Sequence, residues 1–382
     1  MAFLLSIEIM NHRIIYCLSL FLVISCYSEK EGEKPIPQIL VEKALPINME
    51  NFEILDLVPL ETTPENLMGL DIRLRMNIQG YYLMDIGIRD AIHHFSLNGS
   101  YLGPAVSVGE GPDQLKGLQD FQVDDEGNLF VLTSMGDVSK VFKKSSGKEW
   151  KEIIDSDYLA SSFTILNSGG FLFSGGHNLP FVENRVILTD PKGNRVRSFL
   201  PNDYQNEMLP TGERNFFESE NSLLYTEIFN NKIYNFNSEE LVPILELDFG
   251  RYALPSDFWE KSLFESFGEL SENGFAVFKA AFESEKHYLV NIHIQKNSGS
   301  FKKVLFIEKQ GDQIFGYEGK SLEEDPFSEP VLVKGEEVIF LSNHSTVKKT
   351  FKNNLSSGLS IKLEERQFDY PVLIKAKLKD EI

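Results

Sequence analysis

Short runs of β-branched and aromatic residues, separated by polar turns, extend over most of the chain. The clearest example is residues 118–154, where four such runs are joined by turns that include 124–128 and 145–148. These turns are rich in Asp, Asn, Ser and Gly, which favour tight reversals of the backbone. Residues 118–154 are therefore predicted to form a four-stranded antiparallel meander.

Similar units recur along the chain. Their first predicted strands lie near residues 72, 121, 163, 217, 267 and 327, so successive units are 49, 42, 54, 50 and 60 residues apart. Repeats of about 40 to 50 residues with four strands each are typical of propeller blades. The pattern predicts an all-β fold, a six-bladed β-propeller of four-stranded antiparallel blades. A β-sandwich with irregular insertions is the alternative, because it could imitate so loose a period.

The repeat region is flanked by further strand patterns. An apolar run covers residues 53–60 before the first unit, and residues 370–378 form the final run. Pairing these two segments would leave no open sheet edge, so we expect the ring to be closed by N- and C-terminal strands. Between them, residues 254–267 contain a Pro-Ser-Asp start signal and predict a short helix within a loop.

The N-terminal residues have the pattern of an export signal. Arg13 precedes an apolar run of eleven residues at 14–24, and a small residue follows before Cys26. Eleven apolar residues are too few to span about 30 Å of hydrocarbon. Residues 1–25 are therefore predicted to be a signal peptide, with Met10 as the better start because initiation at Met1 would place an acidic residue inside the signal.

The end of this signal contains a possible acylation motif. Residues 23–26 read Val-Ile-Ser-Cys and resemble the bacterial lipobox, in which the Cys becomes the lipidated first residue of the mature protein. The motif predicts that Cys26 is acylated and holds the protein on a lipid bilayer without spanning it. The alternative is an ordinary secretory signal, or a buried strand, with Cys26 as a bystander.

The segment after Cys26 predicts a spacer before the folded domain. Residues 27–35 are charged, contain a Pro and lack an apolar pattern, so residues 26–51 are expected to form a flexible tether and residues 52–382 the propeller. The same stretch contains three acidic residues that fit surface export in some bacteria and favour anchoring to the outer membrane: Glu29, Glu31 and Glu33.

Composition narrows the classes of partner. The chain has 57 acidic and 37 basic residues and a formal charge of −20, with no block rich in Lys and Arg. Nucleic-acid binding requires a basic face, so no nucleic-acid partner is expected. The two cysteines are Cys17 and Cys26, and the propeller therefore has neither a disulfide nor a thiolate metal site.

Several segments together resemble a family of bacterial six-bladed β-propeller lipoproteins that are similar to NHL-repeat propellers. The matching segments run from about Cys26 to the end of the chain: 58–70, 95–102 with 108–115, 248–255 and 370–378. Two departures are Gln114, where family members often have Glu, and weak turns within the third and fourth blades. The resemblance implies the fold and the lipid anchor, but no shared catalytic residues, because a fold does not confer function.

The usual catalytic motifs are not found in the sequence. It contains no Gly-x-Ser-x-Gly elbow, no His-Glu-x-x-His helix and no paired Cys motif. His93 and His94 would point to opposite faces of a strand, and the acidic turn at 124–128 lacks the spaced ligands of a calcium loop. We therefore expect no catalytic residues, no metal and no cofactor.

The propeller geometry points to the central channel as the candidate site. The first strand of each blade faces this channel, and five polar residues lie at these positions or on a rim loop: Arg73, Asp120, His177, Arg214 and Glu218. The alternative is that they are ordinary solvated side chains.

These observations predict an envelope-anchored lipoprotein that acts as a non-enzymatic binding or scaffold module for a glycan, a peptide or an envelope protein. A propeller hydrolase or lyase with a channel-bound divalent metal is the other hypothesis, since ligands drawn from several blades leave no compact motif.

Overall fold

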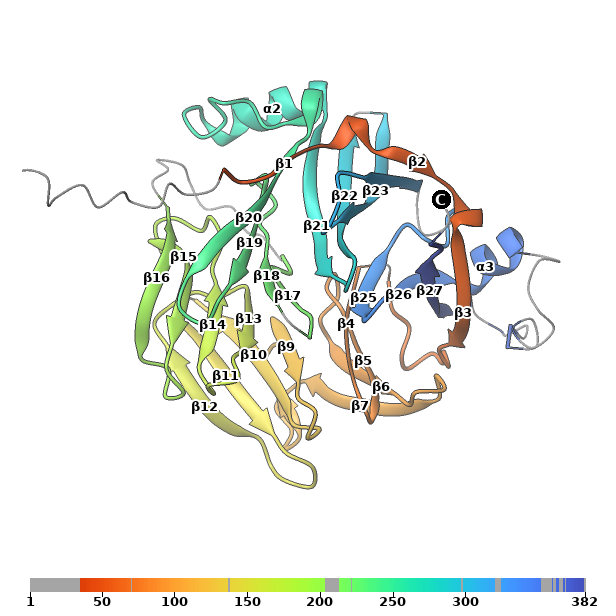
Figure 1. Ribbon diagram of the computed structural model, residues 1–382. Helices are drawn as coiled ribbons and strands as arrows, with labels where there is room; N and C mark the ends of the chain where they lie inside the picture. Colours follow the sequence, from red (N-terminus) through yellow and green to blue (C-terminus); the bar gives the residue numbers. More distant parts are fainter. Residues whose placement is uncertain are drawn as a thin grey trace, which may run out of the picture. The chain divides into compact units, whose positions relative to one another are not determined.

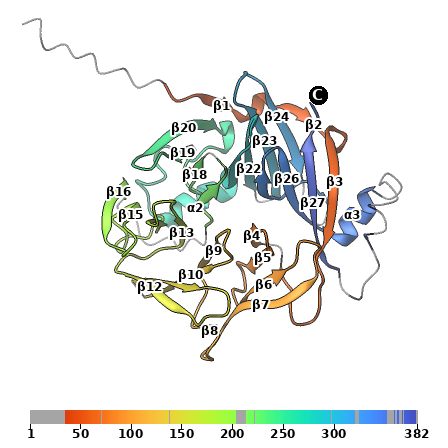
Figure 2. The same ribbon diagram turned by 60° about the horizontal axis from the view of Figure 1, so that its bottom comes forward.

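Alternating apolar and polar residues produce six small sheets that surround a common axis (Figure 1, Figure 2). This computed structural model describes residues 35–380 except 70, 137, 203–212, 221, 297, 320–323, 352–358, 360–361, 364–366 and 368. Residues 38–382 form one unit. The predicted six-bladed β-propeller is confirmed.

The first three blades follow one another along the chain, each built from the axis outward. Blade 1 contains β4 (Ile72–Asn77), β5 (Gly80–Asp85), β6 (Ala91–Phe95) and β7 (Tyr101–Val108), with β8 (Gln114–Leu115) in parallel beside β7. Blade 2 contains β9 (Asp120–Val123), β10 (Leu129–Met135), β11 (Val138–Lys144) and β12 (Lys151–Ser156). Blade 3 contains β13 (Ser162–Ile165), β14 (Phe171–Ser174), β15 (Asn184–Thr189) and β16 (Arg195–Pro201).

The next two blades have the same plan. Blade 4 contains β17 (Phe216–Glu218), β18 (Leu223–Tyr225), β19 (Lys232–Phe236) and β20 (Leu241–Asp248). Blade 5 contains β21 (Phe275–Glu283), β22 (His287–Lys296), β23 (Gly299–Glu308) and β24 (Ile314–Gly319). The innermost strand of each blade contacts those of its two neighbours, so the six inner strands line a continuous ring: β4, β9, β13, β17, β21 and, from the sixth blade, β25 (Pro330–Lys334).

Blade 6 joins the two ends of the chain. It contains β25 (Pro330–Lys334), β26 (Glu337–Asn343) and β27 (Pro371–Leu378) from the C-terminal region, and β3 (Phe52–Pro59) as its outermost strand. β27 and β3 are antiparallel, with Leu378 opposite Phe52 and Val372 opposite Pro59. The predicted closure by terminal strands is confirmed, and it leaves no unpaired edge between the first and last blades.

The propeller begins earlier than the sequence predicted. β1 (Gln38–Leu40) adds a parallel fifth strand to β20, and β2 (Leu45–Ile47) does the same on β24. Residues 38–51 are therefore a strap across the outer edges of blades 4 and 5 rather than part of a flexible tether (Figure 1). Strands of three residues give no readable alternation, and their partners lie about 200 residues away in β20 and more than that in β24, so local pattern could not reveal the pairing.

Large apolar side chains fill the space between blades. Phe52 of the closing strand stacks on Phe327 with ring centroids 4.5 Å apart, and both rings lie in the core shared by blades 4, 5 and 6. Val41 and Ile47 of the strap are buried in the same core. The strap and the closure therefore depend on packing as well as on backbone pairing.

Helices are few in the described residues. α2 (Leu263–Asn273) begins after Ser262, whose side chain accepts a hydrogen bond from the Glu265 backbone N–H. The predicted helix at 254–267 was thus placed too early, and the unit start at 267 was wrong because it falls within α2. α3 (His344–Phe351) was not predicted. Over the described part of the chain, no helix is long and apolar enough to cross a membrane.

Candidate functional site

Strand alternation places polar side chains from neighbouring blades against one another at the channel wall. Arg73 and Arg75 are two residues apart on β4, so they share one face, and that face meets Asp120 and Gln122 of β9. The Arg73 Nη1 atom lies 2.7 Å from Asp120 Oδ1, and Arg75 Nε donates to Gln122 Oε1 at 2.7 Å. The two rows form a polar ladder between blades 1 and 2.

The ladder continues into blade 3 through one residue. Asp120 accepts from the backbone N–H of Phe163 at 3.0 Å, and Gln122 donates to the Phe163 carbonyl at 2.9 Å. Arg73 also donates to the backbone carbonyl of Glu213, at 2.9 Å. Arg73 and Asp120 are 3% and 1% exposed, so this buried pair ties together blades 1, 2 and 3 and the segment that enters blade 4.

Arg214 is held at the channel by a different set of contacts. It donates from Nη1 to the Val331 carbonyl at 3.1 Å, and its guanidinium lies 4.7 Å from the ring centroid of Phe217 and 5.4 Å from that of Phe282. Burial, and then the nearby charges of Arg75 and Arg73, hold the pKa of the Arg214 guanidinium well below its usual range. Among the described residues, no carboxylate lies within salt-bridge distance of Arg214.

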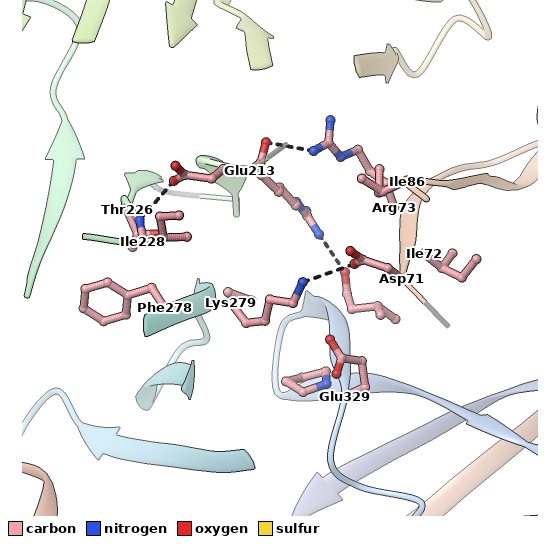
Figure 3. Close-up of a pocket in the computed structure, with 14 residues that line it drawn as sticks. Asp71, Ile72, Arg73, Ile86, Glu213, Thr226, Ile228, Phe278, Lys279 and Glu329 are labelled. Carbon is pink, nitrogen blue, oxygen red and sulfur yellow. Dashed lines mark hydrogen bonds and ion pairs between the residues drawn. The ribbon is translucent and has the colours of Figure 1, made fainter. Parts of the chain in front are cut away.

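A cavity of about 290 Å³ opens at the face of the ring where inner strands begin, and Figure 3 shows the residues that line it. Its apolar wall is formed largely by Ile72, Ile86 and Ile228. Its charged residues come from four blades and the segments that lead into them: Asp71, Arg73, Glu213, Arg214, Lys279 and Glu329.

Two β-bulges shape this cavity. The pairing of β21 with β22 skips a residue between Phe278 and Ala280, which makes Lys279 the extra residue. The pairing of β25 with β26 skips Val331, whose carbonyl accepts from Arg214. A bulge leaves its extra residue outside the ladder and re-aims it. Over their described residues the other four inner strands pair in unbroken register.

The carboxylates that line the cavity already have partners. Asp71 lies 3.2 Å from the Lys279 ammonium, and Glu213 accepts from the Ile228 backbone N–H at 3.0 Å. Glu329 is paired with Lys302. Burial alone would raise the pKa of Glu329, but the neighbouring His293 and Lys302 outweigh it and lower that pKa to about 2. Glu329 is therefore ionised at neutral pH, and each of the three carboxylates has a partner in the structure.

The opposite mouth of the channel is wider and more acidic. This cavity, of about 740 Å³, is lined by Arg75, Arg214 and Glu218, and its rim includes further carboxylates: Asp125, Glu220, Glu283, Glu285 and Glu337. Glu218 accepts a hydrogen bond from the Thr164 hydroxyl. Arg214 lines both cavities and so lies between the two mouths.

The structure separates the sequence-predicted residues into two groups. Arg73, Arg214 and Glu218 line one or both cavities, and Asp120 is paired with Arg73 behind them, whereas His177 lies apart from this group. His177 is buried in the loop after β14, where its ring stacks on Trp259 with centroids 4.6 Å apart. Burial lowers its pKa to about 4, so it is neutral at physiological pH. His177 lies in a loop, as predicted, but Trp259 and the neighbouring Phe229 pack against its ring.

Sequence reasoning missed other channel residues. Arg75 and Gln122 could have been found, because each is two residues from a chosen position on the same strand and therefore shares its face. Lys279 was missed because the start of blade 5 was placed in α2, and no local signal marked the bulge. Cys26 lies outside the described residues. In the part of the chain that the structure describes, no group of three or more His, Cys, Asp or Glu side chains could hold a metal ion.

Fold and site together define a six-bladed β-propeller whose central channel opens into a small charged cavity. The profile of the family described as "Domain of unknown function (DUF4934)" matches residues 37–375, and the chain belongs to this family. No curated protein matches the sequence.

The chain is similar to several solved structures, to different degrees. A protein from Bacteroides fragilis described as exported has a TM-score of 0.71 and 14% sequence identity, covering 90% of this chain and 99% of that one. Virginiamycin B lyase from Staphylococcus aureus has a TM-score of 0.40 and 12% identity, covering 76% and 95%. The calcium-binding protein regucalcin from Agrobacterium tumefaciens has a TM-score of 0.40 and 11% identity, covering 89% and 96%.

Proposed function

We propose that this protein is an exported, lipid-anchored binding module that takes a small ligand, or the tip of a larger one, into the cavity around Arg214 and Lys279. The observation that carries the proposal is the pair of β-bulges at Lys279 and Val331. Bulges interrupt backbone pairing and are concentrated beside functional sites, where they re-aim a side chain. Here both serve one concave site with apolar walls and a few convergent polar groups, the usual composition of a ligand pocket.

The export and anchoring part of the proposal rests on the sequence. The basic residue, short apolar run and Val-Ile-Ser-Cys motif that end at Cys26 support it. The exported B. fragilis protein with the same fold is consistent with it. Glycans, peptides and envelope proteins are the classes of partner that we would screen first.

A metal-dependent hydrolase or lyase is less well supported by the channel. Three guanidinium groups, those of Arg73, Arg75 and Arg214, line the channel. Their charges oppose the binding of a divalent cation there, since like charges repel strongly in a partly desolvated site. The binding role therefore remains the preferred function.

Ligand binding is tested by thermal shift with the whole protein against a library of glycans, peptides and small metabolites, because a ligand that binds the folded state raises its stability whatever its chemistry. Ile86→Trp fills part of the cavity, and Ile78→Trp is its control because Ile78 is 78% exposed and lines the opposite mouth. A hit that is weakened at least tenfold by Ile86→Trp and not by Ile78→Trp supports the proposal. If the affinity of every hit is unchanged by both substitutions, the ligands bind elsewhere and the proposed site is contradicted.

Membrane anchoring is tested separately in cells. Cys26→Ala should move the protein from the membrane fraction to the soluble fraction, because a single thiol carries the proposed lipid. Detergent partitioning of wild type and variant measures this. An unchanged membrane fraction in Cys26→Ala would show that acylation is not the anchor.

A further inference from the structure

Among the described residues, the charged side chains that line the cavity are paired, with the exception of Arg214. Each carboxylate that lines it has a positively charged or hydrogen-bonding partner, and Arg73 is paired with Asp120 at 2.7 Å. The direct contacts of Arg214 among the described residues are a backbone carbonyl and two aromatic rings, and the carboxylates of Asp120 and Glu218 act on it only from beyond salt-bridge distance. Of the three cations that line this cavity among the described residues, Arg73 and Lys279 each have a carboxylate within salt-bridge distance and Arg214 does not.

From this arrangement we propose that Arg214 binds the carboxylate of a small organic acid that enters the cavity from the face where the inner strands begin. This inference rests on the proposed function and specifies the ligand class of the same site. A carboxylate is planar and matches the donor fork of a guanidinium, which lets two N–H groups donate in parallel.

The surroundings favour a single negative charge. Asp71, Glu213 and Glu329 line the same cavity, so a doubly charged phosphate or sulfate would meet three carboxylates with only one uncompensated cation to offset them. A monocarboxylate neutralises Arg214 and adds no excess charge. The shift of the Arg214 pKa below its usual range has the same physical basis, since burial and two neighbouring guanidiniums disfavour its unpaired positive charge.

The geometry also limits the size of the ligand and its orientation. Stacking of the guanidinium near Phe217 and Phe282 and its bond to the Val331 carbonyl hold it in place before a ligand arrives, which lowers the ordering cost of binding. A volume of about 290 Å³ accommodates an acid about as large as one sugar or amino-acid residue. Its carbon skeleton would rest against Ile72, Ile86 and Ile228.

The experiment uses formate and acetate as minimal probes and D-glucuronate as a probe of the expected size. The melting temperature of the whole protein is measured in each sodium salt up to about 100 mM against chloride at equal ionic strength, since specific binding adds stability in proportion to the logarithm of ligand concentration. We expect a concentration-dependent rise with all three carboxylates. Glucuronamide, the neutral counterpart of glucuronate, should give none.

Variants assign the effect to Arg214. Arg214→Gln should abolish the carboxylate-specific rise, and Arg214→Lys should weaken glucuronate binding at least tenfold in titration calorimetry, because an ammonium lacks the planar fork. Arg251→Gln is the matched control, because Arg251 is exposed and lines neither cavity. If Arg214→Gln does not fold, the Arg214→Lys comparison and the salt series on wild type still decide the question.

The outcomes separate the two proposals. Three results would overturn the carboxylate assignment. They are no rise in melting temperature above that in chloride with any carboxylate, an equal rise in Arg214→Lys, and tighter binding of inorganic phosphate than of glucuronate. If in addition a neutral library ligand binds and is lost in Ile86→Trp, the binding function stands without it. If carboxylates bind and Ile86→Trp has no effect on them, they do not bind in this cavity, and both the proposed function and the carboxylate proposal fail.

Discussion

Removing Asp120 should destabilise the propeller more than any other single change at the channel wall. Asp120 is 1% exposed, and its carboxylate accepts from three groups: Arg73 Nη1 at 2.7 Å, the Phe163 N–H at 3.0 Å and the Phe121 N–H at 2.6 Å. Asp120→Ala would leave a buried guanidinium without its counter-charge and two backbone donors unpaired. Breaking a buried ion pair from one side costs about 3–5 kcal/mol.

Urea and thermal unfolding measure this cost. With an unfolding entropy of about 2.1 cal/mol/K per residue, a unit of this size should lose roughly 4–7 °C in melting temperature. Asp155→Ala is the matched control, because Asp155 is 58% exposed at its side chain and lies 3.1 Å from Lys140. An exposed pair of this kind contributes at most about 1 kcal/mol.

A second substitution tests the reason for the loss. Adding Arg73→Met to Asp120→Ala removes the uncompensated charge and should restore part of the stability, because an apolar pair can replace a buried ion pair at little cost. Asp120→Ala with the stability of Asp155→Ala would refute the argument that this pair holds blades 1 and 2 together. A double variant less stable than Asp120→Ala would refute the charge-based explanation.

Three further predictions concern other parts of the fold. Burial lowers the pKa of His177 from 6.5 to about 4, so the unfolded chain binds more protons than the folded chain between these pH values. The free energy of unfolding should therefore fall by up to about 3 kcal/mol as the pH drops from 6.5 to 4. Urea unfolding of His177→Phe should show a weaker dependence on pH. Deleting residues 370–382 removes β27 and exposes the edge of β3, so size-exclusion chromatography should show aggregation, and an unchanged melting curve would contradict ring closure by this strand. Ile47→Ala in the strap should cost about 2–4 kcal/mol, and Leu45→Ala, at a position 50% exposed, less than about 1 kcal/mol in the same unfolding assay.

The candidate site was only partly accessible to sequence reasoning. Position near the start of a predicted inner strand was enough to select Arg73, Asp120 and Arg214, because the inner strands of a propeller face its axis. The sequence did not show which of the two arginines, Arg73 or Arg214, would lack a carboxylate partner. The answer depends on distances between blades, such as the 2.7 Å between Arg73 and Asp120, which exist only after the ring has closed.

The local alternation of apolar and polar residues, which recurs at similar spacing along the chain, was sufficient to predict a six-bladed propeller and its closing pair of strands, although the start of the fifth unit was misplaced. The blades and the closing strands come from segments that are long enough to show a two-residue period, and the turns between them are rich in Asn, Asp and Gly. The tertiary structure alone decided the strap, the bulges at Lys279 and Val331, and the burial of His177. β1 pairs with β20 across about 200 residues of chain, and a bulge shifts register by one residue without a required sequence. These features depend on the packing of strands that are distant in the sequence. A local pattern of apolar and polar residues does not predict such contacts.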